Sequence, residues 1–168
     1  MERRTLIKAV GAVAWAGAAA RVGAATEVPL PAVGSALKLP DVALLDGSRF
    51  QASQAQGQVV LIYWWASWCP FCAATTPFVQ KLWDAQRSRG LTMLGLSVDR
   101  RVEDARKYMV QRGYTFPTAF NTAEVERVLP RPGKALPVTC VRGRDGRVLM
   151  SEPGQLFEED VEQIARFL

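Results

Sequence analysis

Two cysteines separated by two residues give the clearest chemical signal in the sequence. Cys69 and Cys72 lie in the run Trp68–Cys72, which closely follows the apolar run Val59–Trp65. That run predicts a buried strand, and the residues after the pair recur at helical spacing, so the pair is expected at a strand-to-helix junction. The free N–H groups and partial positive charge of a helix N-terminus stabilise a thiolate. The arrangement is suited to thiol–disulfide exchange.

Three other roles for the pair fit the sequence less well. A structural zinc site takes four ligands, whereas the chain has three cysteines and no histidine. A purely structural disulfide across so short a loop would restrict the unfolded chain by only about 2 kcal/mol. Two unrelated core cysteines would leave the flanking strand and helix patterns unexplained. The third cysteine, Cys140, falls in an apolar segment and is expected to be a small buried core residue.

The first 25 residues have the pattern of an export signal. A basic start with Arg3, Arg4 and Lys8 precedes the apolar stretch Ala9–Ala20, and small residues follow it. The paired arginines favour the twin-arginine type of signal, with a Sec signal and an uncleaved anchor as the alternatives. We therefore expect a signal peptide at 1–25 and a periplasmic, oxidising location. Contact with the membrane is expected only if the signal is not cleaved.

The charge of the chain gives no reason to expect a nucleic-acid partner. The formal net charge is +5, but four basic residues and one acidic residue lie in the first 25 positions. The remainder has 17 basic and 15 acidic residues, a balance of +2. Arg142, Arg144 and Arg147 flank an Asp-Gly turn, where solvated charge is the usual state.

The remaining patterns predict a linker at 26–40, which contains three prolines and a glycine, and one α/β domain at 41–168. The expected elements are a hairpin at Val42–Phe50 around Asp46-Gly47, strands at Leu91–Val98, Val138–Val141 and Val148–Met150, and helices at Val102–Arg112, Ala123–Leu129 and Phe157–Leu168. Together with the strand and helix around the cysteines, they predict a mixed central sheet flanked by helices, with an N-terminal β-hairpin extension.

In the order of these elements and motifs, the chain resembles the thioredoxin superfamily. The resemblance is carried by the segments Trp64–Cys72, Leu96–Asp99 and Leu136–Thr139, and by Pro77 in the helix after the cysteines. The signal, the hairpin and the helical segment before Pro137 make the chain most similar to the TlpA/ResA-type periplasmic thiol–disulfide oxidoreductases, which include cytochrome c maturation reductases.

The resemblance implies a role for each residue of the expected site. Cys69 would be the attacking cysteine and Cys72 the resolving one, while Pro137 matches the family's cis-proline and presents the backbone of Leu136 to a partner. Tyr63 stands in the central strand where the family often has Asp or Asn. A DsbD/CcdA-like membrane protein is the implied electron donor and a protein disulfide the implied substrate, with no metal or cofactor.

Four residues around the cysteines are expected to form a surface for substrate docking: Trp68, Pro70, Phe71 and Leu136. We also expect Cys69 to be exposed and Cys72 to be buried. Because Pro70 and Phe71 supply no cation to stabilise a thiolate, the sequence favours a reductase.

An oxidase or isomerase of secreted proteins is the alternative enzyme. A Sco-like copper chaperone would need a histidine, and a peroxiredoxin would need a threonine in place of Ala66. A protein-binding module without catalysis is the remaining alternative, and it requires that the cysteines be inert to a dithiol reductant.

Overall fold

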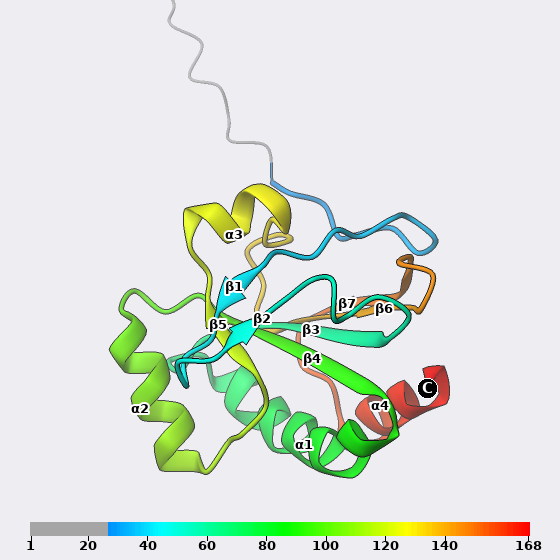
Figure 1. The fold of residues 1–168 in the computed structure, drawn as a ribbon. Coiled ribbons are helices and arrows are strands. Elements are labelled where there is room, and N and C mark those ends of the chain that lie inside the picture. Colours follow the sequence, from blue (N-terminus) through cyan, green and yellow to red (C-terminus); the bar gives the residue numbers. More distant parts are fainter. Residues whose placement is uncertain (1–26) are drawn as a thin grey trace, which may run out of the picture.

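The computed structural model describes residues 27–168, and the predicted signal at 1–25 lies outside them. Five strands form the central sheet in the order β5–β4–β3–β6–β7 (Figure 1). Their bounds are Val59–Trp65 for β3, Leu91–Ser97 for β4, Thr118–Phe120 for β5, Val138–Arg142 for β6 and Val148–Pro153 for β7. The middle strand, β3, pairs in parallel with β4 and antiparallel with β6. This is the predicted mixed sheet.

Strand β3 is the centre of the core, and every one of its seven residues is buried. A run that is apolar on both faces is typical of a central parallel strand covered on both sides by other elements. Strand β3 pairs with β4 along its whole length, from Val59 opposite Leu91 to Trp65 opposite Ser97. The carboxyl ends of β3 and β4 therefore lie next to each other, beside the turn that leads to Cys69.

Four helices and two 3₁₀ turns complete the domain. They are α1 (Pro70–Gln86), η1 (Arg87–Arg89), α2 (Val102–Arg112), α3 (Ala123–Val128), α4 (Glu158–Gln163) and η2 (Ile164–Phe167). In Figure 1, α1 and α4 lie together on one face of the sheet and α3 lies on the other. Helix α2 has the predicted bounds and ends at Gly113, whose φ of 68° only glycine adopts readily. The predicted closing helix is shorter, because its last turn tightens into η2.

The predicted N-terminal hairpin is present as β1 (Val42–Ala43) and β2 (Arg49–Phe50), paired antiparallel. It is attached to the main sheet through β5, which the sequence patterns did not predict: the Leu45 N–H donates to the Thr118 carbonyl at 2.7 Å. Three residues are too few to show a strand period, and β5 follows directly on Pro117. Within residues 27–168, no helix is long and apolar enough to cross a membrane.

The segment before the hairpin, predicted as part of a linker, is hydrogen-bonded to the domain. The N–H of Gly34 donates to the Val148 carbonyl at 2.8 Å, and the Val148 N–H donates to the Ser35 carbonyl at 2.9 Å. Nearer its start, Glu27 accepts a hydrogen bond from the Lys134 N–H at 2.9 Å. We call residues 27–37 the N-terminal strap.

Candidate active site

Helix α1 places the two cysteines at its first turn. Cys69 is the N-cap residue, and its Sγ accepts a hydrogen bond from the Cys72 N–H at 3.2 Å. Pro70 takes the first helical position, where the N–H that proline lacks would have no partner in the helix. Both thiols are free. The sulfur of Cys69 thus receives a backbone N–H and the positive end of a 17-residue helix, which together stabilise a thiolate.

Cys69 is buried, with 4% of its surface exposed, so the expectation of an exposed cysteine is wrong. The reason is the segment Leu136–Pro137, which lies against it: the Leu136 carbonyl oxygen is 3.7 Å from Cys69 Sγ. The bond between Leu136 and Pro137 is cis, as the resemblance implied. Cys69 and Pro137, 68 positions apart in sequence, are therefore brought together in one site by the fold.

Cys72 is buried as expected, at 1% exposure. Its burial raises the pKa of the thiol far above the usual value, and the hydrogen bond with Cys69 raises it further. A thiol with such a pKa keeps its proton at neutral pH. The two cysteines therefore differ in the way that an attacking and a resolving cysteine must differ: the sulfur of Cys69 caps the N-terminus of the helix, whereas burial keeps the thiol of Cys72 protonated.

The expected docking residues divide into two groups. Trp68 and Phe71 are exposed, at 64% and 57%, and Pro70 is exposed between them. Leu136 is buried at 8%, so the expectation that its side chain adds to an exposed apolar surface is wrong, while docking through its backbone stays a prediction. Its side chain packs into the core, while its carbonyl faces Cys69.

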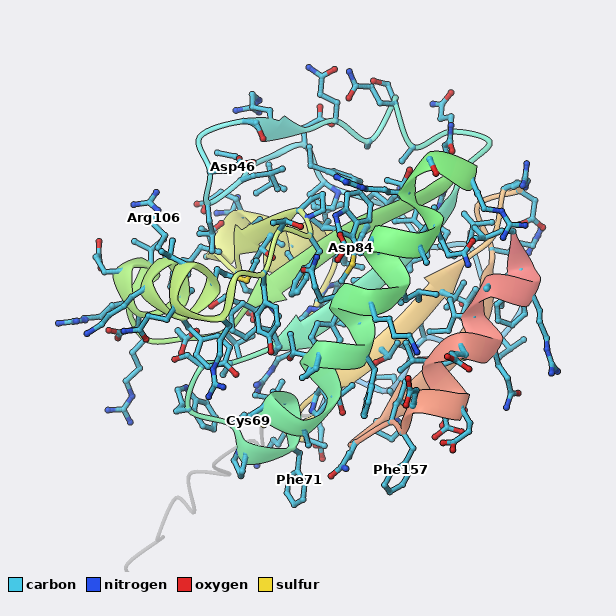
Figure 2. The ribbon with its side chains drawn as sticks, turned by 90° about the horizontal axis from the view of Figure 1, so that it is seen from below. Asp46, Cys69, Phe71, Asp84, Arg106 and Phe157 are labelled. Carbon is cyan, nitrogen blue, oxygen red and sulfur yellow. The ribbon has the colours of Figure 1, made fainter. Side chains whose placement is uncertain are left out.

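Sequence reasoning missed Phe157, a further exposed aromatic residue at this end of the molecule. Figure 2 shows Phe157 and Phe71 projecting from the same end as Cys69. The loop before α4 is held there by Thr75 of α1, whose hydroxyl donates to the Leu156 carbonyl and accepts from the Leu156 N–H, both at 3.2 Å. Phe157 is 61% exposed. The helical period placed it at the start of a helix and gave no signal that this start lies beside the cysteines.

Beneath Cys72, two hydroxyl groups replace the acid or amide that the family often has. The Tyr63 hydroxyl is 3.0 Å from Thr76 Oγ1, and Thr76 donates to the Cys72 carbonyl at 2.6 Å. Burial raises the pKa of Tyr63 well above its usual value, so the phenol stays neutral and cannot take up a proton from Cys72.

Cys140 is separated from this pair by the sheet. In the pairing of β3 with β6, Ile62 is opposite Cys140 and Tyr63 is opposite Thr139, so Cys140 lies on the face away from Tyr63 and Cys72. It is fully buried, as the sequence predicted, and burial raises the pKa of its thiol to about 12. It has no part in the arrangement around Cys69.

Comparison with known proteins places this geometry in a family. Residues 34–149 match the sequence pattern of the AhpC/TSA family, over more than half of the chain. The chain belongs to the AhpC/TSA family. This AhpC/TSA protein is similar to the thiol-disulfide oxidoreductase ResA of Geobacillus thermodenitrificans. The two are 28% identical over 141 residues, which cover 82% of this chain and 79% of that protein. It is 23% identical to ResA of Bacillus anthracis over 119 residues, 70% of this chain and 68% of that one.

Solved structures agree on the fold. A thiol:disulfide interchange protein of the thioredoxin family from Chlorobium tepidum has a TM-score of 0.73 and 22% identity, covering 80% of this chain and 96% of its own. A secreted disulfide oxidoreductase of Mycobacterium tuberculosis has a TM-score of 0.67 and 17% identity, covering 77% and 96%. The fold is thioredoxin-like, and the AhpC/TSA protein described here is a thiol–disulfide oxidoreductase, which confirms the prediction of the enzyme class.

Proposed function

We propose that this protein is an extracytoplasmic protein disulfide reductase that works through the Cys69–Cys72 pair. The observation that carries the proposal is the place of Cys69 at the N-terminus of α1, with its sulfur 3.2 Å from the Cys72 nitrogen. A thiolate is stabilised at this position, and a second thiol lies in the same first turn of the helix to resolve the mixed disulfide that the first one forms.

In the proposed cycle, the Cys69 thiolate attacks one sulfur of a substrate disulfide. A Cys69–substrate disulfide forms, and the other substrate sulfur leaves as a thiolate. Cys72 then passes its proton to the substrate thiolate that left in the first step and attacks Cys69, forming the Cys69–Cys72 disulfide and releasing the second substrate thiolate. Two electrons pass from the protein to the substrate. A membrane electron donor of the DsbD/CcdA type would return the pair to the dithiol.

The direction of the reaction follows from the charges around the pair. Pro70 and Phe71 supply no cation to the pair, and the carboxylate of Asp99 adds only a small contribution to the pKa of Cys72, which burial is the main cause of raising. A reduced form without strong thiolate stabilisation belongs to a less oxidising couple. We therefore expect a reduction potential nearer to that of thioredoxin, about −270 mV, than to that of DsbA, about −120 mV.

The sequence and the exposed surface support the location and substrate that we propose. The pattern at 1–25 supports export by the twin-arginine route, and Trp68, Phe71 and Phe157 form an exposed apolar surface for a protein substrate. Proteins of cytochrome c maturation are the substrates that the family resemblance favours.

Equilibration of the purified domain with glutathione buffers, followed by Trp68 fluorescence, tests the direction. A potential more oxidising than about −180 mV, that of protein disulfide isomerase, would contradict the reductase and favour an oxidase or isomerase. In the host, Cys72→Ala should trap mixed disulfides with the substrate through Cys69. The matched controls are Cys69→Ser, which should trap none, and Cys140→Ala, which should not alter the wild-type pattern.

A further inference from the structure

Asp99 is a buried carboxylate at the carboxyl end of β4, two residues beyond the strand. It is 5% exposed, and it accepts hydrogen bonds from three groups of two serines. The Ser67 N–H lies 3.1 Å and 3.2 Å from its two oxygens, the Ser67 hydroxyl donates at 2.7 Å, and the Ser97 hydroxyl donates at 2.8 Å. The ion pairs found within residues 27–168 do not include Asp99. Within residues 27–168, the hydrogen bonds that the side chain of Asp99 accepts all come from neutral donors.

These hydrogen bonds join the end of β4 to the turn that leads to Cys69. Trp65 and Ser97 are paired across the two parallel strands, and the Val98 N–H donates to the Trp65 carbonyl at 2.9 Å. Immediately beyond this pair, the chain of β3 turns toward α1, and Ser67 is the residue of the turn that Asp99 binds. Since Ser67 stands two residues before Cys69, the carboxylate fixes the backbone from which the helix and its N-cap start.

Asp99 also lies at the wall of an open cleft of about 820 Å³ beside Trp68. The charged and titratable groups that α2 and its leading turn contribute to this cleft are Arg100, Asp104, Lys107 and Tyr108. Asp104 is half exposed and forms an ion pair with Arg101 at 2.8 Å. A buried carboxylate acts at longer range than a solvated one, because little water screens it. Burial is the main cause of the raised pKa of Cys72, and the charge of Asp99 is the smallest of the causes that raise it.

We propose that Asp99 is a positioning residue that sets the reduction potential of the Cys69–Cys72 couple: it holds Ser67 in place, and its buried negative charge keeps the couple reducing. The reduced pair reacts through a thiolate, and a buried negative charge beside the turn that leads to Cys69 disfavours that thiolate, so the disulfide is favoured and the dithiol is the stronger reductant. The inference rests on the redox couple proposed above, and it holds for either direction of catalysis.

The test is the glutathione equilibrium of Asp99→Asn. Asparagine has nearly the same shape: one oxygen still accepts from Ser67, and the new NH₂ group can donate to the hydroxyl of Ser97. The charge alone is lost, so we expect the equilibrium to shift about tenfold toward the dithiol, or about 30 mV toward a more oxidising couple. Asp104→Asn is the matched control, since it removes the same charge from the solvated side of the same cleft, and should shift the equilibrium less than twofold.

A second variant separates charge from position. Ser67→Ala removes a donor and leaves the carboxylate charged, so it should not make the couple more oxidising. Three results would each overturn the inference. The first is an Asp99→Asn variant with the potential of the wild type. The others are a potential raised as much in Asp104→Asn, or as much in Ser67→Ala, as in Asp99→Asn. A wild-type protein without any dithiol–disulfide transition would instead refute the proposed function.

Both redox states of each variant are checked for folding by near-UV circular dichroism. If Asp99→Asn did not fold, Ser67→Ala combined with Ser97→Ala would decide the question. This pair of substitutions withdraws two hydroxyl donors from the carboxylate. At a pH where the carboxylate stays ionised its charge is less compensated, so we expect the equilibrium to shift toward the disulfide. The absence of that shift would overturn the inference.

Discussion

Cys140 offers a quantitative test of the environment that the fold gives to its thiols. The thiol is fully buried on the face of the sheet away from Cys72, and its burial raises the pKa from 9.0 to about 12. In the unfolded chain the thiol ionises at its ordinary pKa. Above pH 9 the unfolded state therefore binds fewer protons than the folded state, and the stability of the protein falls as the pH rises. The contribution of Cys140 is fully present below pH 9 and is lost progressively up to about pH 12.

The size of the effect follows from the two pKa values. At pH 10 the unfolded thiol is mostly ionised and the folded one is not, and the difference amounts to about 1.4 kcal/mol relative to pH 7. The Cys140→Ala variant has no thiol at this position, so it lacks this part of the decrease in the free energy of unfolding between pH 7 and pH 10. The substitution also leaves a small cavity, but that cost is the same at both pH values and cancels in the comparison.

The assay is urea unfolding at pH 7 and pH 10 in a background with Cys69→Ser and Cys72→Ser, which leaves no second thiol for disulfide exchange. The pH dependence of the free energy of unfolding should be smaller by about 1.4 kcal/mol when Cys140 is replaced by alanine. Tyrosines and other groups titrate alike in both proteins. The same pH dependence with and without Cys140 would refute the buried thiol, and with it the register of β6 on β3 that places Cys140 in the core.

Two other predictions concern the exposed aromatic residues and the loop before α4. Phe71→Ser and Phe157→Ser should each lower kcat/KM for a protein disulfide about tenfold, as expected when an interface loses an exposed aromatic anchor. With a small-molecule disulfide, kcat/KM should change less than twofold. An equal loss of kcat/KM with both substrates would contradict a docking role. Thr75→Val should lower the free energy of unfolding by about 1–3 kcal/mol, because two buried backbone groups of Leu156 lose their partner. Urea unfolding measures that loss, and a neutral Thr75→Val would mean that the loop finds other partners.

Much of this fold could be predicted because its strongest signals are local. Strand β3 is apolar on both faces, and helix α2 has a clear amphipathic period followed by a glycine. The cysteine pair marks the junction between β3 and α1. Such patterns require no knowledge of what the element packs against. Strand β5, with three residues, has too short a pattern to be found in this way.

The contacts that complete the site could not be predicted, because they join segments far apart in sequence. A leucine is compatible with an exposed docking surface and with the core, so the sequence does not distinguish the two for Leu136. The path of the loop decides that its side chain is buried and its carbonyl faces Cys69. Phe157 comes to the site through the hydrogen bonds of Thr75. Asp99 stood in the motif that carried the family resemblance, but its hydrogen bonds to Ser67 depend on the pairing of β3 with β4.

The N-terminal strap has a consequence for the order in which the chain can fold. Its partners are the turn between β6 and β7 and the loop before Pro137, both of which are synthesised more than 100 residues later. The strap cannot acquire its hydrogen bonds before that hairpin exists, and closing so long a loop is entropically unfavourable until the sheet has formed. The first described residues of the chain are thus expected to be the last to become ordered. Hydrogen exchange during refolding would then protect the amides of Gly34 and Leu37 after those of β3 and β4.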